Sequence, residues 1–265
     1  MSGFFARLFG ESPRESQFPD SWRTLLAECM PCHRLLDPGE QRRLHAIVGS
    51  LLNEKFFEGC NGFEITDRVR LTIASHAALL LLNLETARFP SLKSILVYPD
   101  TFIAPRTYED DLGLVSELDE ELVGESWELG AVIFSWREIE EDTRSIGPRN
   151  VILHEFAHQI DPMDGNGDWP PHLDGEAIDQ WLDGFDCEYA RLLKAVQKGS
   201  RTFIDEYGAE DPAEFFAVGT ETFFNRPRRL QQQHPRLYDA FRTFYRQDPA
   251  RRMATQAAAG DCGAL

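Results

Sequence analysis

Residues 150–165 read NVILHEFAHQIDPMDG and contain the segment HEFAH. On an α-helix, residues four apart lie on the same face, so His154 and His158 can present two imidazole nitrogens to one metal ion. Glu155 lies about 100° around the helix from His154, where it can reach a water held by that metal without being a ligand. This spacing is typical of a zinc site in which the glutamate acts as a general base.

The neighbouring residues indicate that this helix is buried. Val151, Ile152 and Leu153 precede the motif, and Phe156 and Ala157 fill its middle. Two histidines and a glutamate are costly to bury in apolar surroundings unless they have a partner. A zinc ion would supply that partner, and the segment therefore predicts a zinc centre.

The whole chain is acidic and of ordinary hydrophobicity. It has 265 residues, 42% of them hydrophobic, and its 27 basic and 44 acidic residues give a net charge of −17. Such a charge disfavours binding to nucleic acid or to an anionic membrane surface. No stretch is long enough to cross a bilayer and no secretory signal is recognised, so we expect a cytoplasmic protein.

The five cysteines are expected to be free thiols because their number is odd and no export signal accompanies them. Cys29 and Cys32 belong to the segment CMPCH, which matches the attachment pattern of haem c. That chemistry normally follows export, so haem or thiol redox function is kept only as a third alternative.

Apolar periodicity and capping residues predict a single α+β domain, mostly helical with a small mixed sheet. In the helix that follows Asp37, Pro38 suits the first turn and Glu40 completes a capping-box pattern. The segment between the strands is acidic and expected to be irregular, and the Gly- and Pro-rich segment 162–175 is expected to be a loop. The second strand is a candidate edge for pairing with a substrate backbone. Helices are predicted at 38–58, at 66–84, in the segment that bears HEFAH, and at about 176–198, 212–225 and 235–246. Strands are predicted at 93–98 and 130–136, a loosely ordered N-terminus at 1–20, the domain at 21–248, and a flexible tail at 249–265.

The third metal ligand is ambiguous from the residues alone. Asp164 stands where one class of zinc peptidases has its last ligand, although Asp161 replaces the glycine of that pattern. Asp161 itself suits either a turn or the support of a ligand histidine. Glu214 and Glu221 share a face of the later helix in DPAEFFAVGTETFF, residues 211–224. Glu214 is equally explained as a capping-box residue behind Asp211 and Pro212.

Several motifs in the same order resemble the Mlc titration factor A family of zinc peptidases. They are NVILHEFAHQID, DEYGAEDPAEFFAVGTETFF, SILVYPDTF and GESWELGAVIFSW, and the similarity covers roughly residues 40 to 245. The HEFAH and EFFA pair is also similar to the catalytic domain of anthrax lethal factor. The CMPCH stretch and the acidic segment 109–128 depart from the family pattern.

The resemblance implies a zincin-like fold and a division of roles. Glu214 would be the third zinc ligand beside His154 and His158, and Tyr207 would support the transition state. The family further implies a cytosolic enzyme that cleaves small peptides, chiefly as an aminopeptidase, and that binds the glucose-responsive repressor Mlc.

Two classes of function therefore stay open. The first is a zinc metallopeptidase with Glu155 as general base and Tyr207 as oxyanion donor. The second is a regulator that sequesters a transcription repressor and uses zinc for structure. They differ in their need for Glu155, because a structural zinc does not require a base.

Overall fold

A computed structural model describes most of the chain. It covers residues 18–84, 89–100, 102–109, 115–122, 124–127, 130–144, 147–160 and 175–261, with side chains described outside 102–127, Gln180 and 256–261. The predicted loop at 162–175, with Asp161 and Asp164, lies outside this range except for its last residue. The N-terminal residues 1–17 and Cys262 lie outside it as well.

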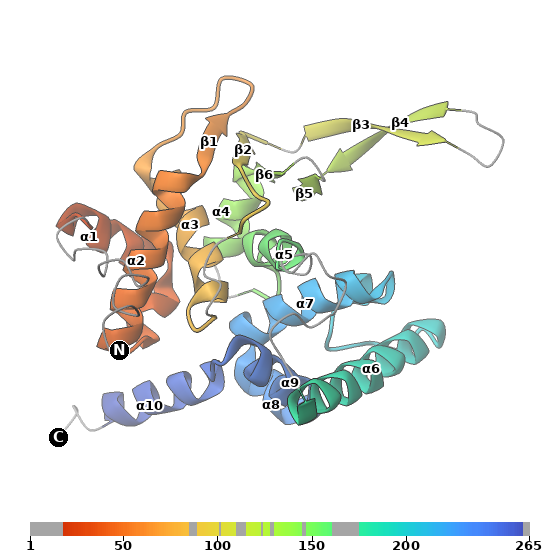
Figure 1. Cartoon of the computed structure of the whole chain (residues 1–265). Coiled ribbons are helices and arrows are strands. Elements are labelled where there is room, and N and C mark those ends of the chain that lie inside the picture. The colour runs from red at the N-terminus through yellow and green to blue at the C-terminus, as the bar shows by residue number, and fades with distance from the viewer. Residues whose placement is uncertain are drawn as a thin grey trace, which may run out of the picture.

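The chain is mostly helical, and the described residues form the expected α+β domain (Figure 1). Each predicted helix is present, although α2 is shorter than expected. The helices are α1 (Asp20–Cys29), η3 (Pro31–Leu35), α2 (Pro38–Glu54), α3 (Asp67–Leu81), α4 (Trp136–Arg144), α5 (Val151–His158), α6 (Gly175–Gln197), η4 (Glu206–Ala209), α7 (Pro212–Asn225), α8 (Pro227–Gln233), α9 (Pro235–Tyr245) and α10 (Pro249–Asp261).

The main sheet has the strand order β1-β2-β6-β5. Its first three strands run parallel, and β5 runs antiparallel to β6, so the sheet is mixed as predicted. β6 therefore lies inside the sheet between β2 and β5, and the expectation that it forms an edge is wrong. The strands are β1 (Phe56–Gly59), β2 (Ser94–Tyr98), β5 (Gly124–Trp127) and β6 (Ala131–Ser135).

The acidic segment between β2 and β6 is not irregular, which corrects a second expectation. β3 (Phe102–Glu109) and β4 (Val115–Leu122) form an antiparallel pair, and Figure 1 shows this ribbon extending away from the helices. Its acidic residues mask the strand signal, because charged side chains are depleted in strands and interrupt the usual alternation of apolar and polar residues.

The second helix ends earlier than its pattern indicates. Asp37 and Glu40 form the predicted capping box, in which Asp37 Oδ1 accepts the Glu40 amide at 2.8 Å. At the other end Lys55 adopts an extended conformation, and Phe56 pairs with Ser94 of β2. Pairing with the sheet therefore overrides the helical periodicity of residues 56–58.

The core joins the sheet to the helices that carry the HEFAH motif and Glu214. α3 is buried over almost its whole length and packs against α2 and α5. Phe156 of α5 stacks near Phe134 of β6, with ring centroids 6.1 Å apart. Gly219 brings α7 so close to α9 that an added Cβ would lie 2.5 Å from the Phe241 ring. Both helices are thus fixed by core contacts.

The chain ends differ in part from expectation. The stretch predicted as a tail contains α10, whose first turn is capped by Asp248 through a 2.9 Å hydrogen bond from the Arg251 amide. In the described residues Cys29, Cys32, Cys60 and Cys187 are free thiols. Burial raises the pKa of Cys32 to about 11, which disfavours its reactive thiolate. None of the described helices is both long and apolar enough to traverse a bilayer.

Candidate metal centre

The helix that bears HEFAH is held at its first turn by three side chains. Asn150 Oδ1 accepts the Leu153 amide at 3.1 Å, as an N-cap does. Asp142 of α4 accepts the Val151 amide at 2.8 Å, and Glu221 of α7 accepts the Asn150 amide at 2.5 Å. The amides of Asn150 and Val151 are thus bound by side chains from α7 and α4. These bonds fix the direction in which α5 presents its histidines.

The helix that bears Glu214 is capped without using the Glu214 side chain. Asp211 Oδ1 accepts the amides of Ala213 and Glu214 at 2.8 and 2.9 Å. The reciprocal half of a capping box is present in α2 and is not formed here. The Glu214 carboxylate points instead toward the two histidines of α5.

His154, His158 and Glu214 place one ligand atom each around a common point. The His154 and His158 Nε2 atoms are 3.3 Å apart, and Glu214 Oε2 lies 3.1 and 3.6 Å from them. Ligand atoms bound tetrahedrally at about 2.0–2.1 Å from zinc are separated by roughly 3.3–3.4 Å. Among the residues with described side chains, this is the only group of three such donors so arranged.

The lack of a hydrogen-bond donor to one Glu214 oxygen also favours a bound cation at this site. Its Oε2 atom is buried and receives no well-directed hydrogen bond, despite its distance of 3.1 Å from His154 Nε2. A buried carboxylate oxygen without a donor is unfavourable. A divalent metal at the centre of the three atoms would satisfy it, so the residues present fit zinc.

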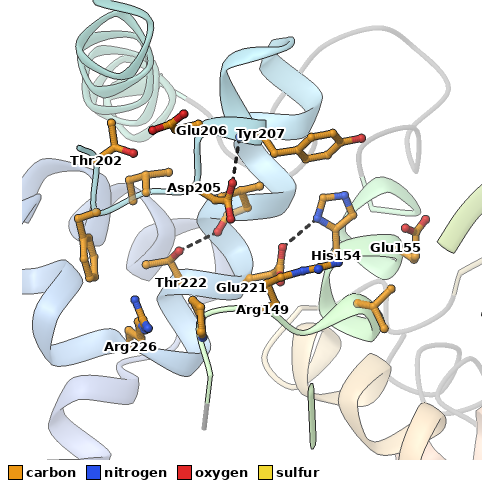
Figure 2. A pocket seen from close by; sticks show the side chains of 15 residues that line it. Arg149, His154, Glu155, Thr202, Asp205, Glu206, Tyr207, Glu221, Thr222 and Arg226 are labelled. Atoms are coloured by element: carbon orange, nitrogen blue, oxygen red, sulfur yellow. Dashed lines mark hydrogen bonds and ion pairs between the residues drawn. The ribbon is translucent and has the colours of Figure 1, made fainter. Parts of the chain in front are cut away.

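Glu221 lies behind His154 and outside the group of three. Its Oε1 atom is 2.9 Å from His154 Nδ1, and Figure 2 shows this contact as a dashed line. A carboxylate at Nδ1 holds the proton on that nitrogen and leaves the Nε2 lone pair free for a metal. The structure therefore makes Glu221 a supporting residue, while Asp164, the other alternative, lies outside the described residues.

The charges around the site favour cation binding. Burial disfavours the charged form of His154, but the Glu214 and Glu221 carboxylates outweigh it and raise its pKa to about 10. Burial likewise disfavours the Glu214 anion, yet the two histidines lower its pKa to about 2. A metal must displace a proton from His154, so metal binding releases protons.

Glu155 lines the same cavity as His154. It is 5% exposed, and burial raises its pKa to about 7, against the opposing effect of His154 and His158. A carboxylate with a pKa near the working pH both accepts and returns a proton efficiently.

Tyr207 lies on η4 beside the same site. The Asp205 carboxylate caps η4 by accepting the Tyr207 amide at 3.0 Å, and Gly208 packs closely against Phe215 of α7. The rings of Tyr207 and His154 are 5.9 Å apart. Burial, reinforced by the Glu214 carboxylate, raises the Tyr207 pKa to about 12, so its hydroxyl stays protonated and can donate.

Four of the residues described above, His154, Glu155, Tyr207 and Glu221, line a cavity of about 770 Å³ (Figure 2). Its remaining lining includes two arginines, Arg149 and Arg226, which the sequence analysis did not single out. Arginines outside the core carry no periodic signal, and only the close approach of α5 and α7 in the fold brings these two together.

The other histidines lie elsewhere. His33 and His45 face each other between η3 and α2, His76 is buried in α3, and His234 binds Glu188 at 2.6 Å. His172 lies outside the described residues. None of the four described histidines belongs to the group of three metal-ligand candidates.

The comparisons with known proteins agree with this geometry. Residues 9–246 match the model of a family described as glucose-regulated metallo-peptidase M90. The chain therefore belongs to this metallopeptidase family, which confirms the resemblance found in its motifs.

Its curated relatives are similar over nearly their whole lengths. The chain is 41% identical to an uncharacterized protein of Synechocystis sp., covering 87% of this chain and 85% of the relative. It is 32% identical to Mlc titration factor A of Salmonella schwarzengrund, covering 91% of each chain. It is 31% identical to Mlc titration factor A of Serratia proteamaculans, covering 88% of each.

Proposed function

We propose that this protein is a zinc-dependent peptidase of zincin type, acting chiefly as an aminopeptidase in the cytoplasm. The observation that carries the proposal is the grouping of His154, His158 and Glu214 at tetrahedral spacing, with the buried Glu155 beside it. The metallopeptidase family to which the chain belongs supports it.

In this proposal, His154, His158 and Glu214 hold one zinc ion. The ion, when bound, lowers the pKa of a coordinated water and polarises the carbonyl of the scissile peptide bond. Glu155 accepts the proton of the attacking water and later transfers it to the departing amine. Its pKa of about 7 suits both transfers.

Tyr207 acts on the developing negative charge of the carbonyl oxygen. Its hydroxyl remains protonated because its pKa is raised to about 12. It therefore donates a hydrogen bond where the oxyanion forms. Its exposed fraction of 47% leaves the ring accessible to a substrate entering the cavity.

The substrate backbone is proposed to lie along β5. Among the strands described, β5 pairs only with β6, and α5 packs against both strands. An extended peptide can add to such an edge through main-chain hydrogen bonds. This replaces β6, whose two sides are both occupied, as the pairing strand.

Exchanging Glu155 for Gln tests the proposal. The Glu155→Gln variant keeps the shape of the side chain and removes its basicity, so hydrolysis of aminoacyl and short peptide substrates should fall by about 10²–10⁴-fold. Zinc content should remain one per chain, since Glu155 is not a ligand. Tyr207→Phe should cost about 10–10³-fold in kcat.

A repressor-binding function is the second candidate. The observation in its favour is the name of the relatives, Mlc titration factor A, at 32% identity over 91% of the chain. An Mlc-like repressor would then be the partner, and zinc would be structural. Full peptidase activity of zinc-loaded Glu155→Gln would count against the catalytic role and favour this second function.

A further inference from the structure

The cavity beside the metal centre is lined by both acidic and basic side chains. Figure 2 shows Asp205 and Glu206 next to Tyr207, whereas Arg226 lies beside Thr222 at the opposite end. Arg149 lines the cavity between that end and His154. The two arginines thus face a cavity that Glu155 and Glu221 also line, in a chain whose net charge is −17.

The two arginines are brought together by a specific contact between helices. Asn225 at the end of α7 donates from Nδ2 to the Arg149 carbonyl at 3.2 Å. Arg226 follows Asn225 directly, and Arg149 directly precedes Asn150, the cap of α5. The amide of Asn150 is in turn held by Glu221. The backbone positions of both arginines are thus fixed relative to His154.

Neither guanidinium forms an ion pair with a described carboxylate, but the charge of Arg149 lies near Glu138 and Asp142 and opposes the rise that burial causes in the pKa of each. Arg226 contacts the face of Phe203 at 6.0 Å, which orients it without neutralising it. Arg149 is exposed and makes no side-chain hydrogen bond to a described residue. Two guanidinium groups that line one cavity can attract an anion, and their planar geometry matches a carboxylate.

We propose that Arg149 and Arg226 form a substrate subsite for a carboxylate of a short peptide. The inference rests on the proposed peptidase function and specifies its substrate class. The carboxylate is either the free C-terminus or the side chain of an acidic residue near the scissile bond. The cavity volume of about 770 Å³ falls within the roughly 300–1,000 Å³ that encloses small ligands, which favours short peptides.

Binding to an inactive, zinc-loaded protein tests the subsite directly. The probes are tetra-alanine with a free C-terminus, its C-terminal amide, and the amide of Ala-Ala-Glu-Ala, titrated calorimetrically into the Glu155→Gln variant. We expect the free acid to bind about tenfold to a hundredfold more tightly than the tetra-alanine amide, as charge-assisted hydrogen bonds do. If the glutamyl amide binds like the acid, the subsite accepts a side-chain carboxylate; if it binds like the tetra-alanine amide, the subsite accepts the C-terminus.

Variants of Arg149 and Arg226 test whether these two residues cause the preference for the carboxylate probe over the amide probe. In the Glu155→Gln background, Arg149→Gln and Arg226→Gln should each reduce the ratio of acid to amide affinity, and the double variant should bring it close to one. Arg226→Lys should retain part of the preference because it keeps the charge. Arg228→Gln is the matched control, since Arg228 is exposed on α8 and does not line the cavity.

The outcomes separate the subsite from the peptidase function. Equal affinity for all three probes, or a preference that survives in Arg149→Gln/Arg226→Gln, overturns the subsite whatever the activity of the wild type. Preferential binding of a carboxylate probe without hydrolysis by zinc-loaded wild-type protein overturns only the peptidase function. Melting temperature and zinc content of each variant identify misfolding, and the single variants then decide the assignment.

Discussion

Two pairs of histidines in this molecule face each other in nearly the same way. The Nε2 atoms of His33 and His45 are 3.0 Å apart, and those of His154 and His158 are 3.3 Å apart. Among the described residues, only the second pair has a carboxylate, that of Glu214, near both nitrogens. The separation of two imidazoles is therefore a poor guide to metal binding by itself.

The residue behind the ring distinguishes the pairs. Arg23 Nη1 lies 3.1 Å from His45 Nδ1, whereas Glu221 Oε1 lies 2.9 Å from His154 Nδ1. A guanidinium only donates, so the neutral His45 ring must accept at Nδ1 and carry its proton on Nε2. A carboxylate accepts, so His154 keeps a proton on Nδ1, and Nε2 becomes available to a metal once the metal displaces the proton there. The charged residue that contacts Nδ1, Arg23 at His45 and Glu221 at His154, thus determines which ring nitrogen is available to bind a metal.

The pKa values of the two sites move in opposite directions. Burial, together with His33 and Arg23, lowers the pKa of His45 to about 4. The carboxylates around His154 raise its pKa to about 10 despite burial. The first pair is a neutral, packed contact, and the second is a site that attracts positive charge.

The largest expected effect is on metal content. His158→Ala or Glu214→Gln should lower bound zinc from one per chain toward zero, because three protein ligands are the usual minimum at a catalytic zinc. His33→Ala and His45→Ala are the matched controls and should retain one zinc. Elemental analysis of dialysed protein measures this, and zinc loss in the control variants would refute the distinction between the pairs.

A smaller effect is expected from the residue behind His154. Glu221→Gln should weaken zinc affinity by about 10–100-fold, as loss of a supporting carboxylate usually does. Asp142→Asn is the control, because Asp142 binds the amide of Val151 in the same helix and has no contact with a ligand histidine. Competition with a chromogenic chelator gives both affinities. Equal weakening in the two variants would mean that Glu221 acts only by holding the helix.

The smallest effect concerns stability at mild acid pH. Because the folded-state pKa of His45 is lowered to about 4, the unfolded chain binds more protons between about pH 4 and its unfolded pKa near 6.5. The contribution of His45 to stability is therefore present above pH 6.5 and is lost as the pH falls through this window. His45→Gln should remove about 2 kcal/mol of the decrease in unfolding free energy between pH 7.5 and 5. Urea unfolding at both pH values measures it, and an unchanged decrease would contradict the assignment.

Part of the candidate centre could be predicted from the sequence. The spacing of His154, Glu155 and His158 already implies a shared helical face, and local patterns predicted α5 and α7. Glu214 and Tyr207 came from family motifs, because Asp211 and Pro212 explain Glu214 as a capping residue equally well. Only the contact between α5 and α7 shows that Glu214 turns toward the histidines while Glu221 supports one of them.

Other parts of the structure were missed for identifiable reasons. The strands β3, β4 and β5 lie in an acidic segment with no clear alternation. The last helix, α10, did carry a signal, since Asp248 and Pro249 suit the cap and first turn and alanines follow. The roles inferred for Arg149 and Arg226 depend on Asn225 joining two distant segments, which local sequence does not encode.

The placement of the three metal-binding candidates also has a consequence for folding. His158 ends α5 and Glu214 lies in the first turn of α7, so a bound ion would close a loop of the intervening residues 159–213. In the chain-entropy model, a cross-link that closes a loop of this length removes roughly 4 kcal/mol of freedom from the unfolded chain, provided that the link persists there. If zinc dissociates on unfolding, it stabilises the protein instead by binding more tightly to the folded state than to the unfolded chain. The same ion that is proposed to support catalysis would then reversibly cross-link α5 and α7, two helices that are far apart in the sequence, and so stabilise the folded state.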